Sequence, residues 1–457
     1  MIKEELKKEG SIGKGYFCDV YKYFDEKSNK YYACKKLRSQ HSQNGDYKNR
    51  LKKEIEFLKR LSECDNIITL IDSNNEDNDL WYLMDYAEHN LFNYIKKNSQ
   101  KLSKENKFEI IEQVINAIKF SHSKNILHRD ISPHNILVFS NNGKIKIKVT
   151  DFGLGKNQES LSYYTNSSVS GYGQILYVEP EQQEKLKDAT NQSDIYSLGK
   201  LIYFIWTSKN PNNIKSSELS SLISKSIEDN RQDRFKNIDE LEKHYITLKD
   251  LHTKSIPQKY ATLNDMLEDL EPINWILFHH LVISYKDNGH PFHDYIHPIL
   301  NILNSRNEII DYHDQIGSDL ITFCQKLSDE MDNCSARTGW DFKETKSFGN
   351  LLVNIIKSTN SDDVKLICFK QLWNLAYIGK QWNVQDSLKK IFNTLYINNK
   401  IELPLAEYIG KHPLKIDISS FKNISKVLKN GIIQSSELFE DEANKAINRK
   451  RNFDLKL

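Results

Sequence analysis

The stretch HRDISPHN, residues 128–135, carries the strongest chemical signal in this sequence. It places Asp130 and Asn135 in a predicted turn after the strand-like run NILH, residues 125–128. A second strand-like run, KIKIKVT, ends next to Asp151, which begins the sequence DFGLG. Asn135 and Asp151 offer oxygen atoms of the kind that Mg²⁺ prefers, and Asp130 can accept a proton from an attacking hydroxyl. The two motifs, in this order and at short range, predict a metal-dependent site for group transfer to a hydroxyl.

An earlier glycine-containing segment, GKGYFCDV at residues 13–20, lies between two strand-like runs. Gly13 and Gly15 have no side chain that would keep the backbone away from a phosphate group. Val20 offers apolar surface that can cover an adenine ring. A glycine pair in a hairpin is usually only a turn, so this segment indicates a nucleotide site only together with the motifs above.

A lysine inside an apolar run is the next signal. Lys35 belongs to the strand-like run KYYACKKL, where a charged side chain is rare unless it has partners. Glu54, on an amphipathic helix predicted over residues 49–63, can be one partner, and a nucleotide phosphate can be the other. The sequence therefore predicts a Lys35–Glu54 ion pair beside the nucleotide.

Taken together, these motifs resemble those of the eukaryotic-type protein kinase family, over about residues 8–250. The resemblance implies a bilobal α+β fold for a kinase domain at about residues 1–252, with ATP and Mg²⁺, or Mn²⁺ in its place, as cofactors. It also implies a β-rich N-lobe over about residues 1–86 and a helical C-lobe over about residues 87–252.

By this resemblance Lys35 holds the α- and β-phosphates and pairs with Glu54 on helix C. Asp130 is the catalytic base, and Asn135 and Asp151 are the metal ligands. The residues implied to line the ATP site are Ile12, Gly13, Lys14, Gly15, Val20, Ala33, Lys35, Met84, Asp85, Ala87 and Leu137.

Three further matches distinguish a protein kinase from a small-molecule phosphotransferase. Pro180-Glu181 resembles the end of the APE motif, and Asp194 resembles the aspartate that braces the catalytic loop. Arg234 resembles the arginine that pairs with the glutamate of that motif, so a buried Glu181–Arg234 pair is expected. Glu179 stands where the motif has alanine, which leaves the local packing open.

Two departures from the family pattern lie on the acceptor side of the site. Ser132 replaces the lysine that reaches the transferring phosphate in Ser/Thr-directed members, and Gln174 replaces the threonine that binds that lysine. We assign Ser132 to the catalytic site, where its hydroxyl offers a neutral hydrogen bond in place of a positive charge. A third departure, Cys18 in place of the last loop glycine, puts a thiol near the nucleotide.

The segment after Asp151 is predicted to be regulatory. Arg129 precedes the catalytic base, and an arginine there can bind a phosphorylated side chain and order the activation segment. This segment is rich in hydroxyl groups, among which we take Thr165 as the regulatory site. A flexible polar loop has the same composition, so that reading stays open.

The composition is that of a globular protein without a membrane or nucleic-acid function. The 457 residues include 64 basic and 62 acidic side chains, for a formal charge of +2. We therefore expect no nucleic-acid binding, no membrane span and a cytoplasmic location. The six cysteines are scattered, without a CxxC pair, and are expected to be free thiols. The basic run at residues 445–451 is interpreted as a solvated helical tail.

Residues 253–457 show recurrent helix signals and few strand signals, which predicts an all-α domain with a regulatory or interaction role. No family resemblance was found for this part. No repeated residue signature is present, so an irregular bundle and an α-solenoid both stay open. Helices are expected to begin at Ser318, Ser361, Asp386 and Ser435.

Histidine and tryptophan residues in this region have two readings. His290, His293 and His297 could face a metal ion if they lay on a helix. Pro291 and Pro298 argue against a long helix there, so a metal site is not favoured. The tryptophans expected to lie in the core are Trp275, Trp340, Trp373 and Trp382.

The sequence thus predicts an ATP- and Mg²⁺-dependent protein kinase that phosphorylates itself and protein substrates, with Ser or Thr as the favoured acceptor and Tyr left open. Control is expected from the activation loop and from the helical C-terminal domain, for which a protein partner is a further expectation. Two alternatives remain: a pseudokinase scaffold that binds nucleotide and acts through the helical domain, and a small-molecule phosphotransferase. The substrate and the oligomeric state are not predicted.

Overall fold

The computed structural model describes residues 5–76, 79–141, 144–152, 175–180, 189–215, 217–253, 260, 262–269, 272–287, 290–338, 342–395, 397–416, 419, 421 and 424–454. For residues 141, 335–338, 342–343 and 446–454 it describes the backbone only. The chain forms two compact units, Met1–Ser255 and Ile256–Leu457. The sequence places the domain boundary at residues 252–253, and independent folding of the two parts stays a prediction.

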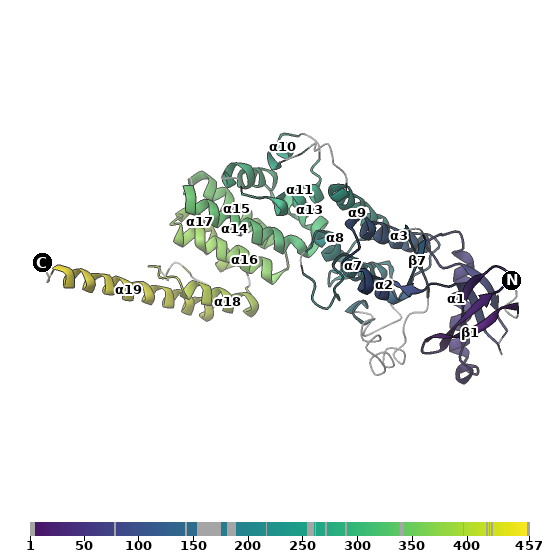
Figure 1. The fold of residues 1–457 in the computed structure, drawn as a ribbon. Helices are drawn as coiled ribbons and strands as arrows, with labels where there is room; N and C mark the ends of the chain where they lie inside the picture. Colours follow the sequence, from purple (N-terminus) through teal and green to yellow (C-terminus); the bar gives the residue numbers. More distant parts are fainter. Residues whose placement is uncertain are drawn as a thin grey trace. The chain divides into compact units, whose positions relative to one another are not determined.

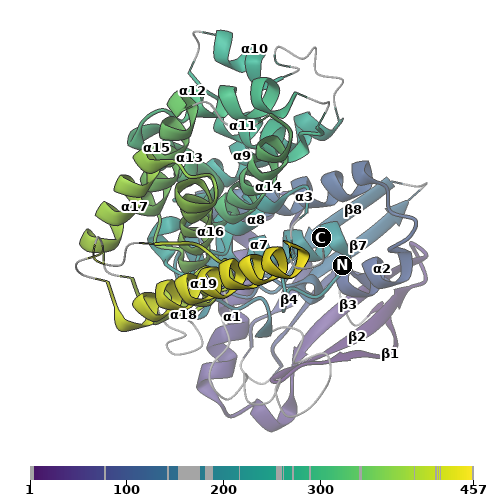
Figure 2. The ribbon, with the colours of Figure 1, turned by 90° about the vertical axis from the view of Figure 1, so that its left-hand side faces the viewer.

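Five antiparallel strands form the N-lobe of the first unit, in the order β1-β2-β3-β5-β4 (Figures 1 and 2). Their bounds are β1 Lys7–Lys14, β2 Cys18–Asp25, β3 Lys30–Leu37, β4 Leu70–Asn74 and β5 Trp81–Asp85. The strand-like run KYYACKKL coincides with β3, in which residues 32–35 are all buried. A strand with both faces covered reads as a continuous apolar run rather than as an alternating one.

Helix α1, Gly45–Arg60, is the one predicted over residues 49–63, and it packs against β3 and β4. It begins earlier than expected because the side chain of Asn44 accepts hydrogen bonds from two backbone N–H groups of the first turn. Its buried face includes Leu51, Ile55 and Leu58 together with the carboxylate of Glu54. The helix therefore delivers a charged group into the lobe along with its apolar stripe.

Helices dominate the C-lobe of the first unit. They are α2 Leu91–Asn98, α3 Lys104–Ser123, α7 Asn191–Thr207, α8 Ser220–Ser226 and α9 Ile238–Thr253. A small sheet of order β6-β7-β8 accompanies them, with bounds His89–Asn90, Ile136–Asn141 and Lys144–Val149. The hydroxyl of Ser103 accepts from Asn106 N–H and caps α3, as predicted. The bilobal α+β fold is confirmed.

The strand predicted at residues 125–128 is wrong. Asn125 has a φ of 57°, a left-handed conformation that a strand does not use. The N–H of His128 donates to the carboxylate of Asp194 at 2.8 Å rather than to a neighbouring strand. The segment carrying Asp130 is therefore a loop between α3 and β7. Its backbone is hydrogen-bonded by the Asp194 side chain of α7.

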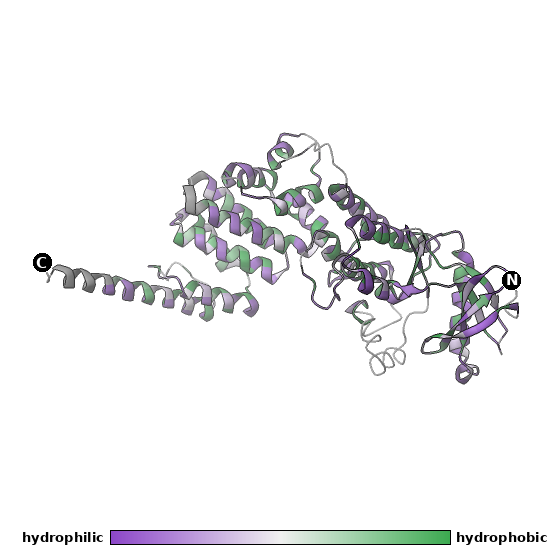
Figure 3. Ribbon diagram, viewed as in Figure 1, coloured by the Kyte–Doolittle hydropathy of each residue, from purple (hydrophilic) through white to green (hydrophobic). Residues whose placement is uncertain are grey.

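All described elements of the second unit are helical, which confirms the predicted all-α region. Its helices are α10 Leu263–Glu268, α11 Trp275–Ser284, α12 His297–Ile302, α13 Arg306–Ile316, α14 Leu320–Thr338, α15 Phe342–Ser358, α16 Asp362–Trp373, α17 Trp382–Thr394, α18 Asn399–Gly410 and α19 Lys426–Asp454. Figure 3 shows apolar and polar residues on alternate sides of most of them, and the apolar sides form one core cluster. Within the described ranges, none of the helices of the chain combines the length and apolar character needed to cross a bilayer.

Of the helix starts predicted in this unit, the one at Ser361 is confirmed, and those at Ser318 and Asp386 are displaced by a few residues. Ser361 caps α16 as expected, because its hydroxyl accepts from the N–H of Val364. Helix α14 begins two residues after Ser318, following a short 3-10 turn at Gly317–Asp319. Helix α17 begins at Trp382, four residues before the predicted start at Asp386.

His293 and His297 lie in a helical segment, although the two prolines had argued against a long helix here, and His290 precedes it. A π-helical turn, Phe292–Ile296, continues directly into α12. Pro298, which has no N–H to donate, follows directly on this π-helical turn and does not end the helix. In the part of the chain that the structure describes, no group of three or more His, Cys, Asp or Glu is arranged to hold a metal ion.

Only some of the tryptophans are core residues. Trp373 is fully buried, and Trp275 is partly buried against the same core. Trp382 is 65% exposed, so its predicted core position is wrong. It is the first residue of α17, at the edge of the helix rather than on its buried face. Trp340 lies outside the described residues.

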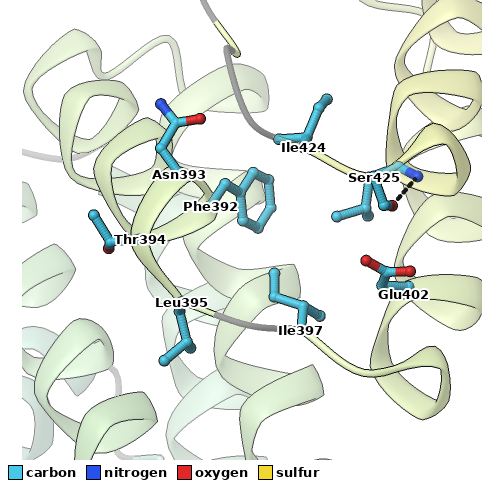
Figure 4. Close-up of a pocket in the computed structure, with 9 residues that line it drawn as sticks. Phe392, Asn393, Thr394, Leu395, Ile397, Glu402, Ile424 and Ser425 are labelled. Atoms are coloured by element: carbon cyan, nitrogen blue, oxygen red, sulfur yellow. Dashed lines mark hydrogen bonds between the residues drawn. The ribbon is translucent and has the colours of Figure 1, made fainter.

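A cavity of about 370 Å³ lies where the end of α17 meets the beginnings of α18 and α19 (Figure 4). Phe392, Ile397, Ile424 and Leu428 contribute apolar surface, and Glu402 contributes the one charged group among its lining residues. The sequence did not predict this cavity. Asn393, Thr394 and Ser425 line it as well, and this mixed lining does not define a ligand, so we assign it none.

Candidate active site

Four strands of the N-lobe bring predicted nucleotide-site residues into one row. Gly13 on β1 is paired with Val20 on β2, and Val20 is paired with Lys35 on β3. Lys35 is paired in turn with Tyr82 on β5. Directly opposite residues of antiparallel strands lie on the same face of a sheet. The loop glycine, the apolar valine and the lysine are thus neighbours on one face.

Lys35 lies between two carboxylates. Its Nζ donates to Oε1 and Oε2 of Glu54 at 2.9 and 3.0 Å, and to Oδ1 of Asp151 at 2.6 Å. Glu54 is fully buried and also accepts from the hydroxyl of Tyr82 at 2.9 Å. Buried charges need such partners because the loss of water opposes the charged form. The cluster therefore ties α1 and β3 to Asp151, the second residue after β8.

Burial and the charges of the neighbouring groups shift the pKa values of Lys35, Glu54 and Asp151. Burial would lower the pKa of Lys35, but the charges of Asp151 and Glu54 raise it well above its ordinary value. Burial raises the pKa of Glu54 to about 8, against the opposing effect of Lys35. Burial also opposes ionisation of Asp151, yet the charge of Lys35 lowers the pKa of this carboxyl. Lys35 thus favours the charged form of Asp151, while burial opposes the charged form of Glu54.

The turn between β1 and β2 is closed by its own backbone. The N–H of Gly15 donates to the carbonyl oxygen of Cys18 at 2.8 Å, and a Cβ at Gly15 would come within 3.1 Å of that oxygen. Phe17, near the tip, stacks on Tyr47 of α1 with ring centroids 5.5 Å apart. The turn is thus attached to the helix that carries Glu54. Burial raises the pKa of the Cys18 thiol, so this cysteine is not a reactive thiolate.

The predicted adenine side of the site lies on β3 and β5. Ala33 and Met84 are paired across these strands, and both are buried. The carboxylate of Asp85 accepts from Nζ of Lys148 at 2.6 Å, so its side chain is engaged and its backbone is what could face a nucleotide. The other predicted lining residues are at least partly exposed: Ile12, Lys14, Ala87 and Leu137.

The loop after α3 holds Asp130 beside Asn135. Nδ2 of Asn135 donates to Oδ2 of Asp130 at 2.9 Å and to its backbone oxygen at 2.8 Å. The N–H of Asp130 donates to Nδ1 of His128 at 3.2 Å, and Nε2 of His128 donates to the carbonyl of Thr150 at 2.9 Å. These bonds fix the tautomer of the histidine. They also join the Asp130 loop to the residue directly before Asp151.

A side chain of α7 supports this loop. Asp194 is buried and accepts from the N–H of His128 and the N–H of Arg129, both at 2.8 Å. Nε2 of His122 adds a third contact at 2.9 Å. Arg129 and Asp151 have φ values of 68° and 66°, which are strained for residues with a side chain. Such strain is typical of functional loops that the surrounding structure holds in place.

Ser132 does not face the loop surface. Its side chain is fully buried, and within the described residues its hydroxyl has no hydrogen-bond partner. Gln174, its predicted functional neighbour, lies outside the described residues. Ser132 therefore remains a predicted catalytic-site residue whose contact with an acceptor is untested.

Ser132→Ala is expected to leave the free energy of unfolding unchanged or to raise it by about 1 kcal/mol, because it removes an unpaired buried hydroxyl. Chemical denaturation of the full chain measures this free energy. The unfolding transition to follow is the one that moves when nucleotide is added, because it belongs to the unit that binds nucleotide. Ser103→Ala is the matched control and should lower the free energy of unfolding by about 1 kcal/mol, because it removes the cap of α3. A clear loss of stability in Ser132→Ala would show that its hydroxyl has a partner.

The predicted Glu181–Arg234 pair needs correction. Nη1 of Arg234 donates to Oε2 of Glu179 at 2.6 Å, and both side chains are fully buried. Arg231 and the hydroxyl of Ser193 also bind the carboxylate of Glu179. The glutamate that stands in place of the motif's alanine is thus the partner of the buried arginine. Glu181 and Thr165 lie outside the described residues.

The sequence analysis missed three residues that organise this site. Tyr82 donates to Glu54, His128 links the Asp130 loop to Thr150, and Lys148 binds Asp85. His128 is part of the quoted HRDISPHN stretch, so its position was visible although its role was not. A tyrosine on a strand-like run gives no such signal because tyrosine is common in strands, and a lysine in the alternating run KIKIKVT can simply face solvent.

The described side chains suit a magnesium nucleotide. Asp151 binds Lys35 through one oxygen, while its side chain is 34% exposed and can present carboxylate to a cation. Asn135 directs its Nδ2 to Asp130, so its Oδ1 is the atom that can coordinate a metal. Lys35 supplies a positive charge on the face of the sheet next to the glycine turn. Hard oxygen ligands beside a buried ammonium group fit a phosphate-bound Mg²⁺.

Comparison with known proteins supports the same assignment. The protein kinase domain family matches residues 6–270. The chain is 34% identical to the serine/threonine-protein kinase PrkC of Bacillus subtilis, over 44% of this chain and 30% of that protein. It is 31% identical to a probable serine/threonine-protein kinase of Clostridium acetobutylicum, over 46% of this chain and 31% of that protein.

A third relative, a probable serine/threonine-protein kinase of Clostridium perfringens, is 30% identical over 57% of this chain and 37% of that protein. The chain thus spans about a third of the length of these relatives. The family match covers more than half of the 457 residues and includes all of the motifs that carry the kinase resemblance. The chain therefore belongs to the protein kinase family.

Proposed function

We propose that this chain is an ATP- and Mg²⁺-dependent kinase that transfers a phosphoryl group to Ser or Thr of itself and of protein substrates. The contact set of Lys35 is the observation that carries the proposal. Its amine is held at hydrogen-bond distance from both Glu54 and Asp151. Phosphoryl transfer by protein kinases requires both this lysine–glutamate pair and the metal-binding aspartate in place.

Each side chain of the cluster has a proposed task. The ammonium of Lys35 binds and orients the phosphates of the nucleotide, and Glu54 fixes the position of that ammonium. The hydroxyl of Tyr82 keeps Glu54 oriented at 2.9 Å. Asp151 and Asn135 would hold Mg²⁺, which neutralises charge on the transferring phosphate. Since Glu54 is fully buried, water competes little for the lysine.

Asp130 is proposed to take the proton of the acceptor hydroxyl. Its carboxylate is half-buried, and Asn135 holds one of its oxygens at 2.9 Å. Positioning matters here, because a base contributes only within hydrogen-bond reach of the hydroxyl it deprotonates. Ser132 supplies no positive charge to the transferring phosphate, so we expect a slow intrinsic rate unless the substrate brings a cation.

Regulation and localisation are further parts of the proposal. Arg129 is exposed, and an exposed arginine beside the base can bind a phosphorylated residue of the activation segment. The helical unit is proposed to control the kinase or to bind a protein partner. The names of the relatives give Ser and Thr as their acceptors, which supports the same acceptors here, and a cytoplasmic location stays a prediction.

Incubation of the purified full chain with MgATP should add phosphate to its own Ser or Thr residues, as mapped by mass spectrometry. Asp130→Asn should reduce this incorporation by about 100-fold or more, because it removes the base and keeps the shape of the side chain. Asp65→Asn is the matched control, since the carboxylate of Asp65 is 93% exposed and outside the site.

Two other outcomes would favour the alternatives. A wild-type chain that binds MgATP but incorporates no phosphate and phosphorylates no protein would support the scaffold. Transfer to a small molecule without transfer to protein would support the small-molecule phosphotransferase. Equal incorporation in wild type and Asp130→Asn would remove Asp130 from the mechanism.

A further inference from the structure

Helix α19, Lys426–Asp454, has a packed N-terminal part. Gly431 crosses α18 so closely that a Cβ there would lie 2.5 Å from the carbonyl oxygen of Ala406. Leu428 and Ile432 are buried in the core of the second unit. The last described contact with the preceding segment is that of Ser436, whose hydroxyl donates to the carbonyl of Leu414 at 3.4 Å. The first eleven residues of α19 are thus anchored.

The rest of α19 has no such packing. All residues from Glu437 to Lys445 are exposed, including the adjacent large apolar side chains of Leu438 and Phe439, each 38% exposed. Among the described helices of the second unit, Figure 1 shows none beside the C-terminal half of α19. Most helical stability in proteins comes from packing of an apolar face, which this part of α19 lacks within the second unit, so a partner that covers it would stabilise it.

The charges of this extension are separated along the helix. Glu437, Glu440, Asp441 and Glu442 form an acidic block, and the sequence then has four basic residues and no acidic one between residues 445 and 451. The centres of the two blocks are about nine residues, or roughly 13 Å, apart along the axis. This exceeds the Debye length of about 8 Å at physiological salt, so, apart from the i,i+4 pair Asp441–Lys445, the two blocks neutralise each other poorly within one helix.

We propose that the segment of α19 from Glu437 to Arg451 pairs antiparallel with the same segment of a second copy of the chain. A two-fold axis across the helix places each acidic block against the basic block of the other copy, whereas parallel pairing would oppose like charges. The same arrangement removes Leu438 and Phe439 from water. The proposal goes beyond the kinase function and does not depend on it.

Other occupants fit this segment less well. The four acidic residues next to the exposed apolar pair would be repelled by phosphate groups of a membrane or a nucleic acid. The segment contains four acidic and four basic residues and is neutral as a whole, which suits a partner with the same pattern. A single helix pair is a small interface, so we expect a dimer with a dissociation constant in the micromolar range.

Sedimentation equilibrium of the full chain should show a monomer–dimer equilibrium that weakens as salt is raised. Reversal of the acidic block, by Glu437→Lys, Glu440→Lys and Asp441→Lys, should weaken dimerisation by at least about tenfold. Reversal of the basic block, by Lys445→Glu, Arg449→Glu and Lys450→Glu, should do the same. An equimolar mixture of the two variants should form a heterodimer, which no loss of folding could produce.

Lys429→Glu is the matched control, because Lys429 is exposed on the anchored part of the same helix and should not affect dimerisation. Three results would overturn the proposal: a monomer at all concentrations, a dimer unaffected by either reversal, or variants that fail to pair when mixed. A monomer whose hydrodynamic radius changes on reversal would show instead that α19 binds to its own chain.

Discussion

Asp151→Ala is expected to lower kcat for phosphoryl transfer by about 100-fold or more while the chain stays folded. The substitution removes the proposed principal metal ligand and one of the two carboxylates that hold Lys35 at hydrogen-bond distance. Lys35 keeps Glu54 as a partner at 2.9 Å, so the buried amine is not left unpaired and the fold should survive. Initial rates at saturating ATP with a Ser- and Thr-containing protein substrate measure the effect.

A binding measurement separates this mechanism from unfolding. Asp151→Ala should still bind nucleotide, because Lys35 and the adenine side remain, but it should lose most of the extra thermal stability that Mg²⁺ adds to the nucleotide complex. Asp65→Asn, at a carboxylate 93% exposed, should behave as wild type in both assays. A near wild-type rate for Asp151→Ala, or a magnesium effect as large as in wild type, would contradict its assignment as a metal ligand.

Elements with a local signal could be predicted from the sequence. Ser103 and Ser361 were identified as caps because a hydroxyl directly before a periodic apolar run leaves little choice of helix start. The start of α19 was placed at Ser435, nine residues late, because this serine resembles a cap in sequence. In the structure Ser435 is buried mid-helix and its hydroxyl donates to the carbonyl of His412, a contact that only tertiary packing reveals.

The same distinction applies to the site. Lys35 and Glu54 could be paired from the sequence because a lysine in a buried run needs a partner and a kinase resemblance supplied one. The role of Tyr82 could not be predicted, because its position beside Glu54 follows from strand register between β3 and β5. The choice between Glu179 and Glu181 depends on the path of an irregular segment, which has no periodicity to indicate which side chain points inward.

Glu179→Ala is expected to lower the free energy of unfolding of the kinase unit by about 3–5 kcal/mol. Arg234 is fully buried, and Glu179 is a carboxylate partner of its guanidinium at 2.6 Å. The guanidinium also donates to backbone oxygens and lies over the ring of Tyr196. Removing one partner of a buried ion pair is strongly destabilising, because the remaining charge loses compensation in the interior. Calorimetry of the full chain measures the effect. The Tm of the unfolding transition that responds to nucleotide should fall by about 10 °C.

The pH dependence of this contribution has a definite sign. Burial alone would raise the pKa of Glu179, but hydrogen bonds from Arg231, Ser193 and Arg234 lower it below the ordinary value of 4.5. A carboxyl whose pKa is lowered by folding stabilises the fold above the pKa of the unfolded chain, and this contribution is lost as the pH falls through the folded value. The difference between wild type and Glu179→Ala should therefore be full at neutral pH and shrink below about pH 4.5.

Three further variants test whether Glu179, and not Glu181, is the partner of the buried arginine. Glu179→Gln keeps the shape and part of the hydrogen bonding but loses the charge, so it should fall between wild type and Glu179→Ala. Arg231→Ala should have a smaller effect than Glu179→Ala, because the side chain of Arg231 is 24% exposed and Arg234 would keep its partner. If Glu181→Ala destabilised the kinase unit as much as expected for Glu179→Ala, while Glu179→Ala had little effect, Arg234 would pair with the glutamate that the family resemblance implies, and the carboxylate at position 179 would be secondary.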